Sequence, residues 1–402
     1  MLYKKRENPK SFAPNYDLTI KAAFTGYIVQ AIVNNFLPLL FVRMQAEFGI
    51  SLSLITLLIT VNFLIQLLVD LLSAPVIDRI GYRASMIISN LCVIIGFILL
   101  TYLPGALENH FIGILIPVFI YAIGGGLQEV LVSPIVEACP TKNKESAMSL
   151  LHSFYCWGHM AVVLLSTVFF RFAGIANWRV LAVIWTVVPL ADLIMFTFVP
   201  IAEFEKSSDE GSNGWKQMIT SGFFWMVMLM MLCAGASEQA VSQWASAFAE
   251  KGLGVTKQLG DILGPMLFAL CMGTSRAIYG VRGHKLDLKK YMYISVLLCI
   301  AAYIVIIVSD NPVITLLSCG LVGFSVGIFW PGTFSMASAG MKGGTLMFAL
   351  LALAGDLGCS AGPALAGVVM SVSGQGMNIG IGAAVIFPVV MLLGLRFIRS
   401  KN

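Results

Sequence analysis

Twelve apolar stretches run through the chain, and each is about as long as a lipid bilayer is thick. A bilayer core of about 30 Å requires about 20 helical residues. Because lipid offers no hydrogen-bond partners to the backbone, each stretch is expected to form an α-helix. The expected spans are residues 18–42, 54–76, 84–104, 112–135, 146–170, 180–201, 218–247, 262–281, 290–309, 312–336, 344–371 and 377–398. The sequence therefore predicts an all-α polytopic membrane protein with twelve transmembrane helices.

The basic residues of the loops test this count. If the N-terminus lies inside, 20 of the 25 Lys and Arg residues fall on the inner side. The remaining five are Arg43, Arg171, Arg179, Lys251 and Lys257. Inner loops of membrane proteins carry an excess of Lys and Arg, and a missed span would have blurred the asymmetry. Both termini are therefore expected in the cytoplasm, with the protein in the cell (plasma) membrane.

The composition excludes several other classes of protein. Charged residues make up 11% of the chain, whereas a soluble domain carries about 25%. The net charge of +5 is accounted for by inner loops that face anionic lipid headgroups, so no nucleic-acid partner is expected. The eight cysteines have no disulfide or metal-ligand spacing, and no phosphate loop or nucleophile elbow occurs. We therefore expect neither an enzyme nor a bound metal or cofactor.

One long hydrophilic connection, EFEKSSDEGSNG at 203–214, divides the spans into six and six. It predicts an N-terminal bundle of residues 1–202, a central cytoplasmic loop of 203–217 and a C-terminal bundle of 218–402. The fifth and eleventh spans open alike, each as a small-residue-rich helix after a short basic loop. Repeated halves of this kind are typical of secondary transporters. One such chain contains a complete pathway, so it is expected to act as a monomer.

Short motifs resemble a known family. The loop after the second span reads Ala74-Pro-Val-Ile-Asp78-Arg79-Ile-Gly81-Tyr-Arg83, which resembles the G-x-x-x-D-R-x-G-R-[RK] signature of the major facilitator superfamily. Three further stretches resemble the fucose permease branch of that superfamily, whose first, fourth and tenth helices carry ANN, G-x-x-E-x-x-x-N-P and PTIFS. They are Val33-Asn34-Asn35, GGGLQEVLVSPIV around Glu129 and GIFWPGTFSMA around Pro331. The resemblance implies two pseudo-symmetric six-helix bundles that transport a solute by alternating access.

The resemblance also implies residues that control access. In this superfamily the loop after the second helix holds neighbouring helices together in one end state. The candidates in this chain are Asp78, Arg79, Gly81 and Arg83, with Glu137 as a partner. On the tenth span, Pro331 is expected to kink the helix and to form a hinge or gate.

Two polar stripes are expected to bind the solute, because the resemblance implies that the first, fourth, seventh and tenth helices line the pathway. Amide and hydroxyl groups beside an indole suit a sugar, although they also suit contacts between helices. The first stripe holds Tyr27, Gln30 and Asn34, which share one helix face, together with Asn35. The second holds Gln239, Ser242, Gln243 and Ser246, beside Glu238 and Trp244.

The aromatic and imidazole groups of two other spans complete the candidate set. His152 on the fifth span is expected to bind solute, because the resemblance gives that helix a polar position there. His159 is expected to form an interhelical hydrogen bond. Trp330 on the tenth span is an aromatic candidate, since it lies away from either end of its span.

Five acids lie inside spans, where an ionised carboxylate costs on the order of 2.5 to 3.5 kcal/mol. Glu129 is the strongest candidate for proton coupling, since it matches the coupling acid of the fucose permease branch. Because Pro38 replaces a second acid of that branch, either Glu129 carries the proton alone or Glu238 shares this task. Asp70 is expected to brace the inner loop and Asp192 to make a peripheral polar contact. Asp356 is expected either to pair with Arg276 or to approach the pathway.

We therefore expect a secondary active transporter that imports a sugar or similar small polar solute by symport with protons, with sodium as the alternative coupling ion. A drug or metabolite exporter is the main alternative, but its pathway would be wide and apolar rather than lined with amides. A channel or a non-transporting sensor fits the repeated halves and the intramembrane acids less well.

Overall fold

The computed structural model describes residues 15–140, 144–202, 218–282, 287–309, 311–341, 344–373 and 376–397. Every element in these ranges is a helix. The expected central loop, 203–217, lies outside the described residues. We call the described residues before it the N-terminal half and those after it the C-terminal half.

The N-terminal half begins with α1 and, after a break, α2. Its elements are α1 (Tyr16–Asn35), η1 (Leu37–Leu40), α2 (Phe41–Phe48), α3 (Leu52–Leu72), α4 (Ala74–Ala106), α5 (His110–Ala138), α6 (Lys144–Ala173), η2 (Ile175–Asn177), α7 (Trp178–Trp185) and α8 (Val187–Phe198). Since Ser73 between α3 and α4 is itself helical, α3 continues into the first turns of α4. That helix ends at Gly81, whose φ of 82° and ψ of 160° favour glycine.

The C-terminal half repeats the pattern. Its elements are α10 (Gly222–Ala247), η3 (Phe248–Gly252), α11 (Lys257–Asp261), η4 (Ile262–Met266), α12 (Leu267–Arg282), α13 (Leu288–Val308), α14 (Pro312–Val326), α15 (Phe329–Gly340), α16 (Gly344–Ser373), α17 (Met377–Gly382), η6 (Ala383–Val385) and α18 (Ile386–Phe397). Within the described ranges, twelve helical segments are long and apolar enough to cross a membrane. The predicted all-α fold with twelve spans is confirmed, and the chain is a multi-pass membrane protein.

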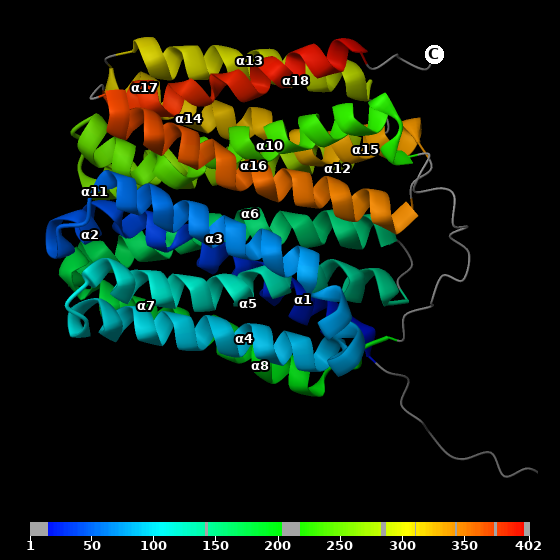
Figure 1. Ribbon diagram of the computed structural model, residues 1–402, viewed down its shortest axis with the longest axis horizontal. Coiled ribbons are helices and arrows are strands. Elements are labelled where there is room, and N and C mark those ends of the chain that lie inside the picture. Colours follow the sequence, from blue (N-terminus) through cyan, green and yellow to red (C-terminus); the bar gives the residue numbers. More distant parts are fainter. Residues whose placement is uncertain are drawn as a thin grey trace, which may run out of the picture.

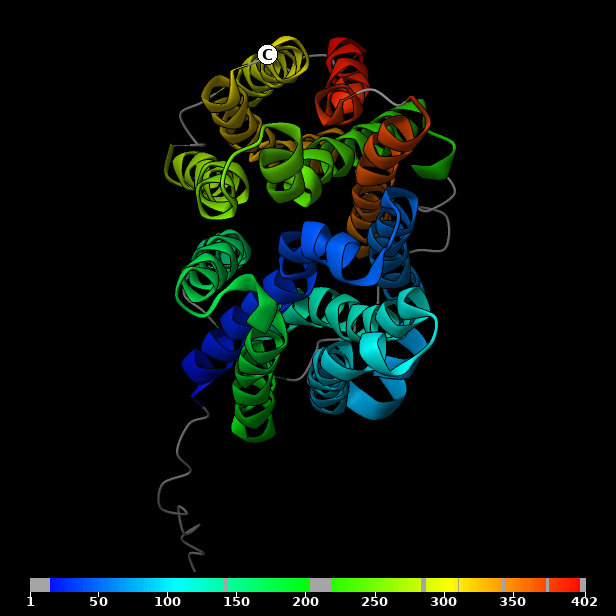
Figure 2. The same ribbon diagram turned by 90° about the vertical axis from the view of Figure 1, so that its left-hand side faces the viewer.

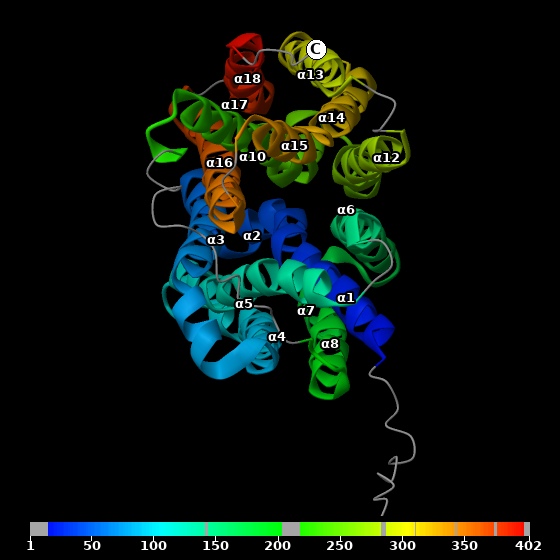
Figure 3. The same cartoon turned by 90° about the vertical axis from the view of Figure 1, so that its right-hand side faces the viewer.

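The long helices run along one axis, and the halves lie against each other along their length (Figure 1). The start of α1 and the end of α18 lie at the same end of the bundle, which we call the terminal end. The opposite, distal end faces the viewer in Figure 2, and the terminal end in Figure 3. In both views α3 lies beside α16, and α6 faces α12. These two helix pairs therefore join the halves.

Prolines break two of the spans. Pro38 has no N–H for the carbonyl of Asn34, and α1 gives way to the short 3₁₀ helix η1 there. In the same way Pro331 cannot donate to Gly327, and α14 and α15 are separated at Gly327 and Ile328. The expected distortion of the tenth span thus lies in the turn before Pro331.

A glycine run sets the position of α5. A Cβ on Gly124 would lie 2.6 Å from the carbonyl of Ser89 on α4, and one on Gly126 would lie 2.9 Å from Val69 on α3. Gly125 is as close to α1, where its Cβ would lie 2.8 Å from Val33. Three consecutive glycines therefore allow α5 to touch three helices at once, within one helical turn of Glu129.

Candidate functional site

Polar side chains from α1, α3 and α5 join in the middle of the N-terminal half. Gln30 Nε2 donates to Glu129 Oε2 over 2.8 Å and to Gln66 Oε1 over 2.9 Å. Gln66 Nε2 donates to Asn34 Oδ1 over 2.8 Å, and Asn62 Nδ2 donates to the same oxygen over 3.2 Å. The predicted face of Gln30 and Asn34 is thus connected to Glu129 through the amides of α3.

The chain of hydrogen bonds crosses to the other half at the backbone of Asn34. Its carbonyl has no helical donor, because residue 38 is a proline. Gln243 Nε2 on α10 donates to this carbonyl over 3.1 Å, and also to Gln239 Oε1 over 3.0 Å. The two predicted stripes therefore meet through a backbone group that Pro38 leaves free.

In the C-terminal half the chain ends at an ion pair. Gln239 Nε2 donates to Glu238 Oε1 over 3.3 Å. Arg276 Nη2 on α12 lies 3.3 Å from Glu238 Oε2, and both side chains are largely buried. Arg276 Nη1 also donates to Cys156 Sγ on α6 over 3.4 Å, which makes a second crossing between the halves. Arg276 therefore pairs with Glu238, one of the two candidate proton-coupling acids.

Tyr27 extends the site towards α6. Its hydroxyl group lies 3.2 Å from Ser133 Oγ and 3.2 Å from His152 Nδ1. His152 is exposed, whereas Tyr27 is buried. His152 thus contacts the predicted first stripe through Tyr27.

The remaining predicted solute-binding residues are positioned in other ways. Asn35 Nδ2 donates to the carbonyl of Ala31 on its own helix over 2.9 Å. Trp330 is half-buried, with its indole ring against Gly355 of α16. Trp244 is fully buried, and its Nε1 donates to the carbonyl of Pro363 over 3.1 Å. In this conformation Trp244 therefore packs between helices and presents no free surface to a solute.

The distal end is closed by contacts between the halves. The rings of Phe41 and Trp244 lie 5.7 Å apart, and Lys251 Nζ donates to Gln45 Oε1. A cavity of about 350 Å³ lies between the halves at this level. Elsewhere on the interface, Thr167 Oγ1 on α6 donates to Asp261 Oδ2 on α11 over 3.3 Å.

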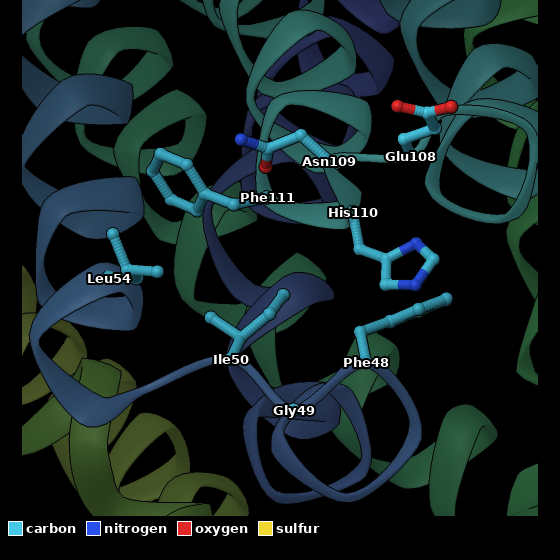
Figure 4. Close-up of a pocket in the computed structure, with 8 residues that line it drawn as sticks. All are labelled: Phe48, Gly49, Ile50, Leu54, Glu108, Asn109, His110 and Phe111. Atoms are coloured by element: carbon cyan, nitrogen blue, oxygen red, sulfur yellow. The ribbon is translucent and has the colours of Figure 1, made fainter.

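A second pocket, of about 380 Å³, lies at the distal end of the N-terminal half (Figure 4). It is lined by α2, α3 and the turn that opens α5. Its polar side chains serve local structure, since Asn109 Oδ1 accepts from Ile112 N over 3.2 Å and His110 Nδ1 lies 2.7 Å from the carbonyl of Pro104. This pocket contains none of the predicted solute-binding residues.

Among the predicted gating residues, Arg83 makes the clearest contacts. Its guanidinium group donates to the carbonyls of Phe196, Thr197 and Val199 over 2.7 to 2.8 Å. It therefore caps the C-terminal end of α8, where carbonyl groups lack helical donors.

The other members of the gating set make fewer contacts among the described residues. Arg79 and Glu137 are exposed, and the salt bridges of the described residues include neither of them. The side chain of Asp78 lies outside the part of the structure that can be described. Gly81 provides the sharp turn at the end of the loop.

Asp192 occupies a separate polar cluster on the side of α8. Its Oδ2 accepts from Asn90 Nδ2 over 2.8 Å and from Gln128 Nε2 over 3.3 Å. All three side chains are fully buried. The expected peripheral polar contact of Asp192 is therefore present.

The sequence reasoning missed Asn62 and Gln66. They lie four residues apart on one face of α3, which is otherwise strongly apolar. That spacing is the same signal that singled out the stripe on α1. The resemblance, however, assigns the pathway to other helices.

Comparison with known proteins agrees with this geometry. A family model described as the Major Facilitator Superfamily matches residues 22–363. A chain of twelve membrane helices with a polar site between two halves is a membrane transporter by fold. The chain belongs to the Major Facilitator Superfamily, as its motifs predicted. No curated protein sequence matches it.

Solved structures of several transporters share the fold. A variant of the Escherichia coli fucose:proton symporter, FucP, has a TM-score of 0.67 and 14% identity, over 96% of this chain and 100% of that chain. A D-xylose-proton symporter has a TM-score of 0.78 and 14% identity, over 95% and 97%. A bacterial homologue of the human lysosomal transporter Spinster, inward-facing and occupied, has a TM-score of 0.76 and 16% identity, over 96% and 97%.

Proposed function

We propose that this protein imports a sugar or similar small polyhydroxylated solute together with protons, by alternating access between its two halves. The observation that carries the proposal is the chain of amide hydrogen bonds from Glu129 through Gln30, Gln66, Asn34, Gln243 and Gln239 to Glu238. It connects one candidate proton-coupling acid in each half. It also crosses the interface whose opening would define alternating access.

The same site has free hydrogen-bonding capacity for a solute. Gln30 Oε1, Asn62 Oδ1 and Arg276 Nε are buried and have no hydrogen-bond partner among the described residues. A buried polar atom without a partner costs about 1 to 3 kcal/mol, and a bound hydroxyl group would remove that cost. Two acceptors and one donor match the hydroxyl groups of a sugar, each of which can donate and accept. Tyr27 and Trp330 are the aromatic candidates for the apolar face of the sugar.

Glu129 is the proposed proton carrier. The salt bridges of the described residues do not include it, and the hydrogen bond that it accepts comes from the neutral amide of Gln30. An unpaired carboxylate inside a membrane protein is costly, so neutralisation by a proton favours the closed site. Glu129 would load a proton from outside and release it inside. The ion pair between Glu238 and Arg276 would break and re-form during the cycle.

The orientation of the protein is part of the proposal. The excess of Lys and Arg on the terminal side favours cytoplasmic termini in the plasma membrane. The distal end would then face outwards, and the structure would be closed on the outside. The gating set (Asp78, Arg79, Gly81, Arg83, Glu137 and Pro331) would open and close the cytoplasmic side. Residues 1–202 and 218–402 would move as two units joined by the loop 203–217, within a single functional chain.

Uptake into proteoliposomes driven by a pH gradient tests the proposal, with a panel of labelled monosaccharides and disaccharides. The wild type is expected to accumulate at least one of them. Glu129→Gln is expected to keep solute exchange and to lose at least about tenfold of the accumulation at a gradient of one pH unit, because one coupled proton contributes that factor. Glu108→Gln changes an exposed acid outside the site and is the matched control.

Other results would point elsewhere. Accumulation under a sodium gradient and not under a proton gradient would make sodium the coupling ion. No sugar uptake under either gradient, with energy-dependent exclusion of lipophilic cations from cells, would replace the importer with an exporter. The amide-lined site does not favour that alternative.

A further inference from the structure

Arg276 is a cation inside the bundle whose hydrogen bonds are incomplete. It lies on α12, which faces α6 across the interface between the halves (Figure 3). Among the described residues, its Nη2 lies 3.3 Å from Glu238 Oε2 and its Nη1 donates to Cys156 Sγ over 3.4 Å, while its Nε is buried without a partner. Ionisable side chains inside a membrane are costly and mostly serve function. The free donor of Arg276 therefore points to a ligand.

The contacts that Arg276 does make are weak. A hydrogen bond between ionised groups is usually about 2.7 to 2.9 Å long, and a guanidinium group often binds a carboxylate through two parallel bonds. The bond to Glu238 is longer, at 3.3 Å, and a cysteine sulfur is a weak acceptor. Nε and Nη2 form one edge of the planar group, the kind of edge that matches a carboxylate. Half of this edge is unused, so another carboxylate can bind to it better than Glu238 does.

The neighbouring amide groups require a different kind of partner. Gln30 Oε1 and Asn62 Oδ1 are also buried with no partner in the described part of the chain. Both atoms only accept hydrogen bonds, so a ligand must offer them O–H or N–H donors. The amides of α1, α3 and α10 connect them to Glu238, the partner of Arg276. A ligand that satisfies the whole site therefore combines one carboxylate with several hydroxyl groups.

We propose that the solute is a sugar acid, a polyhydroxylated monocarboxylate of the uronic or aldonic type, whose carboxylate replaces Glu238 on Arg276. The inference rests on the proton-driven import proposed above and names the substrate class of the same site. A neutral sugar also satisfies the amide oxygens. It offers only a hydroxyl group to Arg276, however, and so binds the site less tightly.

The exchange of carboxylates on Arg276 links the solute to a proton. The other three salt bridges of the described residues lie at the distal end, so the displaced Glu238 has no second cation among them. An uncompensated buried carboxylate is strongly unfavourable, and a proton on Glu238 restores the balance of charge. The anion and this proton enter together while the site is open to the outside. Both leave when it is open to the inside, and Glu238 then pairs with Arg276 again.

Binding to the full-length protein in detergent tests the substrate class. D-Galacturonate and D-galactose differ only at C6, and so do D-glucuronate and D-glucose; D-gluconate represents the aldonic acids. The wild type is expected to bind at least one acid about tenfold more tightly than D-galactose and D-glucose, because hydrogen bonds to charged groups are the stronger ones. Equal or weaker binding of all three acids overturns the inference. Equally tight binding of lactate would show that the hydroxyl groups do not contribute, and also overturns it.

Two variants assign the preference to Arg276. Glu238→Gln removes the competing carboxylate and is expected to tighten binding of the acid. Glu238→Gln/Arg276→Gln leaves no uncompensated charge, and it is expected to bind the acid no more tightly than the neutral sugar. If the double variant keeps the preference, Arg276 is not the carboxylate site. Arg43→Gln removes a guanidinium group that pairs with Glu47 at the distal end, and as the matched control it should keep the wild-type preference.

Uptake into proteoliposomes separates this inference from the proposed function. Binding of an acid that depends on Arg276, without accumulation of any acid or sugar under a pH gradient, would leave the substrate class standing and refute proton-driven import. Accumulation of a neutral sugar that a tenfold excess of D-galacturonate, D-glucuronate or D-gluconate does not inhibit would leave the import standing and refute the substrate class.

Discussion

At the scale of single residues, the ion pair of Glu238 and Arg276 is the most sensitive point of the site. Arg276 Nη2 and Glu238 Oε2 lie 3.3 Å apart with side chains 15% and 6% exposed. Removing one partner of a buried pair leaves an uncompensated charge, whereas removing both leaves two neutral groups. The pair therefore differs from Glu129, which accepts its hydrogen bond from a neutral amide.

Arg276→Gln is expected to destabilise the protein by about 3 to 5 kcal/mol, since Glu238 then lacks its cation. The double variant Glu238→Gln/Arg276→Gln is expected to recover most of this loss. Thermal unfolding of the detergent-solubilised protein measures both effects. Equal losses in the single and double variants would show that Arg276 acts through packing rather than through its charge.

At the scale of the element, a proline in the first span creates the crossing between the halves. Because Pro38 has no N–H, the carbonyl of Asn34 lacks its helical donor, and Gln243 Nε2 donates to this carbonyl over 3.1 Å. The same residue type breaks the tenth span before Pro331. The break at Pro38 therefore provides a hydrogen-bonding group at the interface between the halves.

Pro38→Ala is expected to restore the helical hydrogen bond to Asn34 and to displace Gln243. A net hydrogen bond is worth about 0.5 to 1.5 kcal/mol, so the distal-closed conformation should lose up to about tenfold in population. Distances between spin labels at Glu108 and Thr256, both exposed at the distal end, measure this population. Pro117→Ala, inside α5, serves as control and should have no such effect.

At the scale of the whole molecule, closure of the distal end depends on contacts between elements far apart in the chain. Asp261 is fully buried and accepts from Ser246 Oγ over 2.6 Å and from Lys257 Nζ over 2.7 Å within its own half. Thr167 Oγ1 adds a donor from the other half over 3.3 Å. Asp261, which pairs with Lys257 in the C-terminal half, thereby also binds the N-terminal half.

Thr167→Val is expected to weaken distal closure by about 1 kcal/mol, which is about a fivefold shift in population. Ser246→Ala removes a donor to the same carboxylate but breaks no contact between the halves, so the population should stay unchanged. The distal spin-label distances distinguish the two variants. An equal shift in both would mean that Asp261 acts only on the stability of its own half.

The resemblance and the polar stripes together predicted much of the site. Gln30 and Asn34 join one polar cluster in the structure, whereas Tyr27 on the same face contacts Ser133 and His152. Their partners Asn62 and Gln66 were missed although they show the same spacing on α3. A helical period identifies which side chains share a face, but it does not say which neighbouring helix that face meets.

The sequence by itself determined the twelve helices and the superfamily. This was possible because backbone hydrogen bonding inside lipid is satisfied within each span, so the length and apolarity of a span are local properties. Only the tertiary structure decided that Gln243 meets the carbonyl of Asn34 and that Arg276 pairs with Glu238 rather than Asp356. These contacts depend on how helices from distant parts of the chain are rotated and packed against each other, which no local pattern encodes.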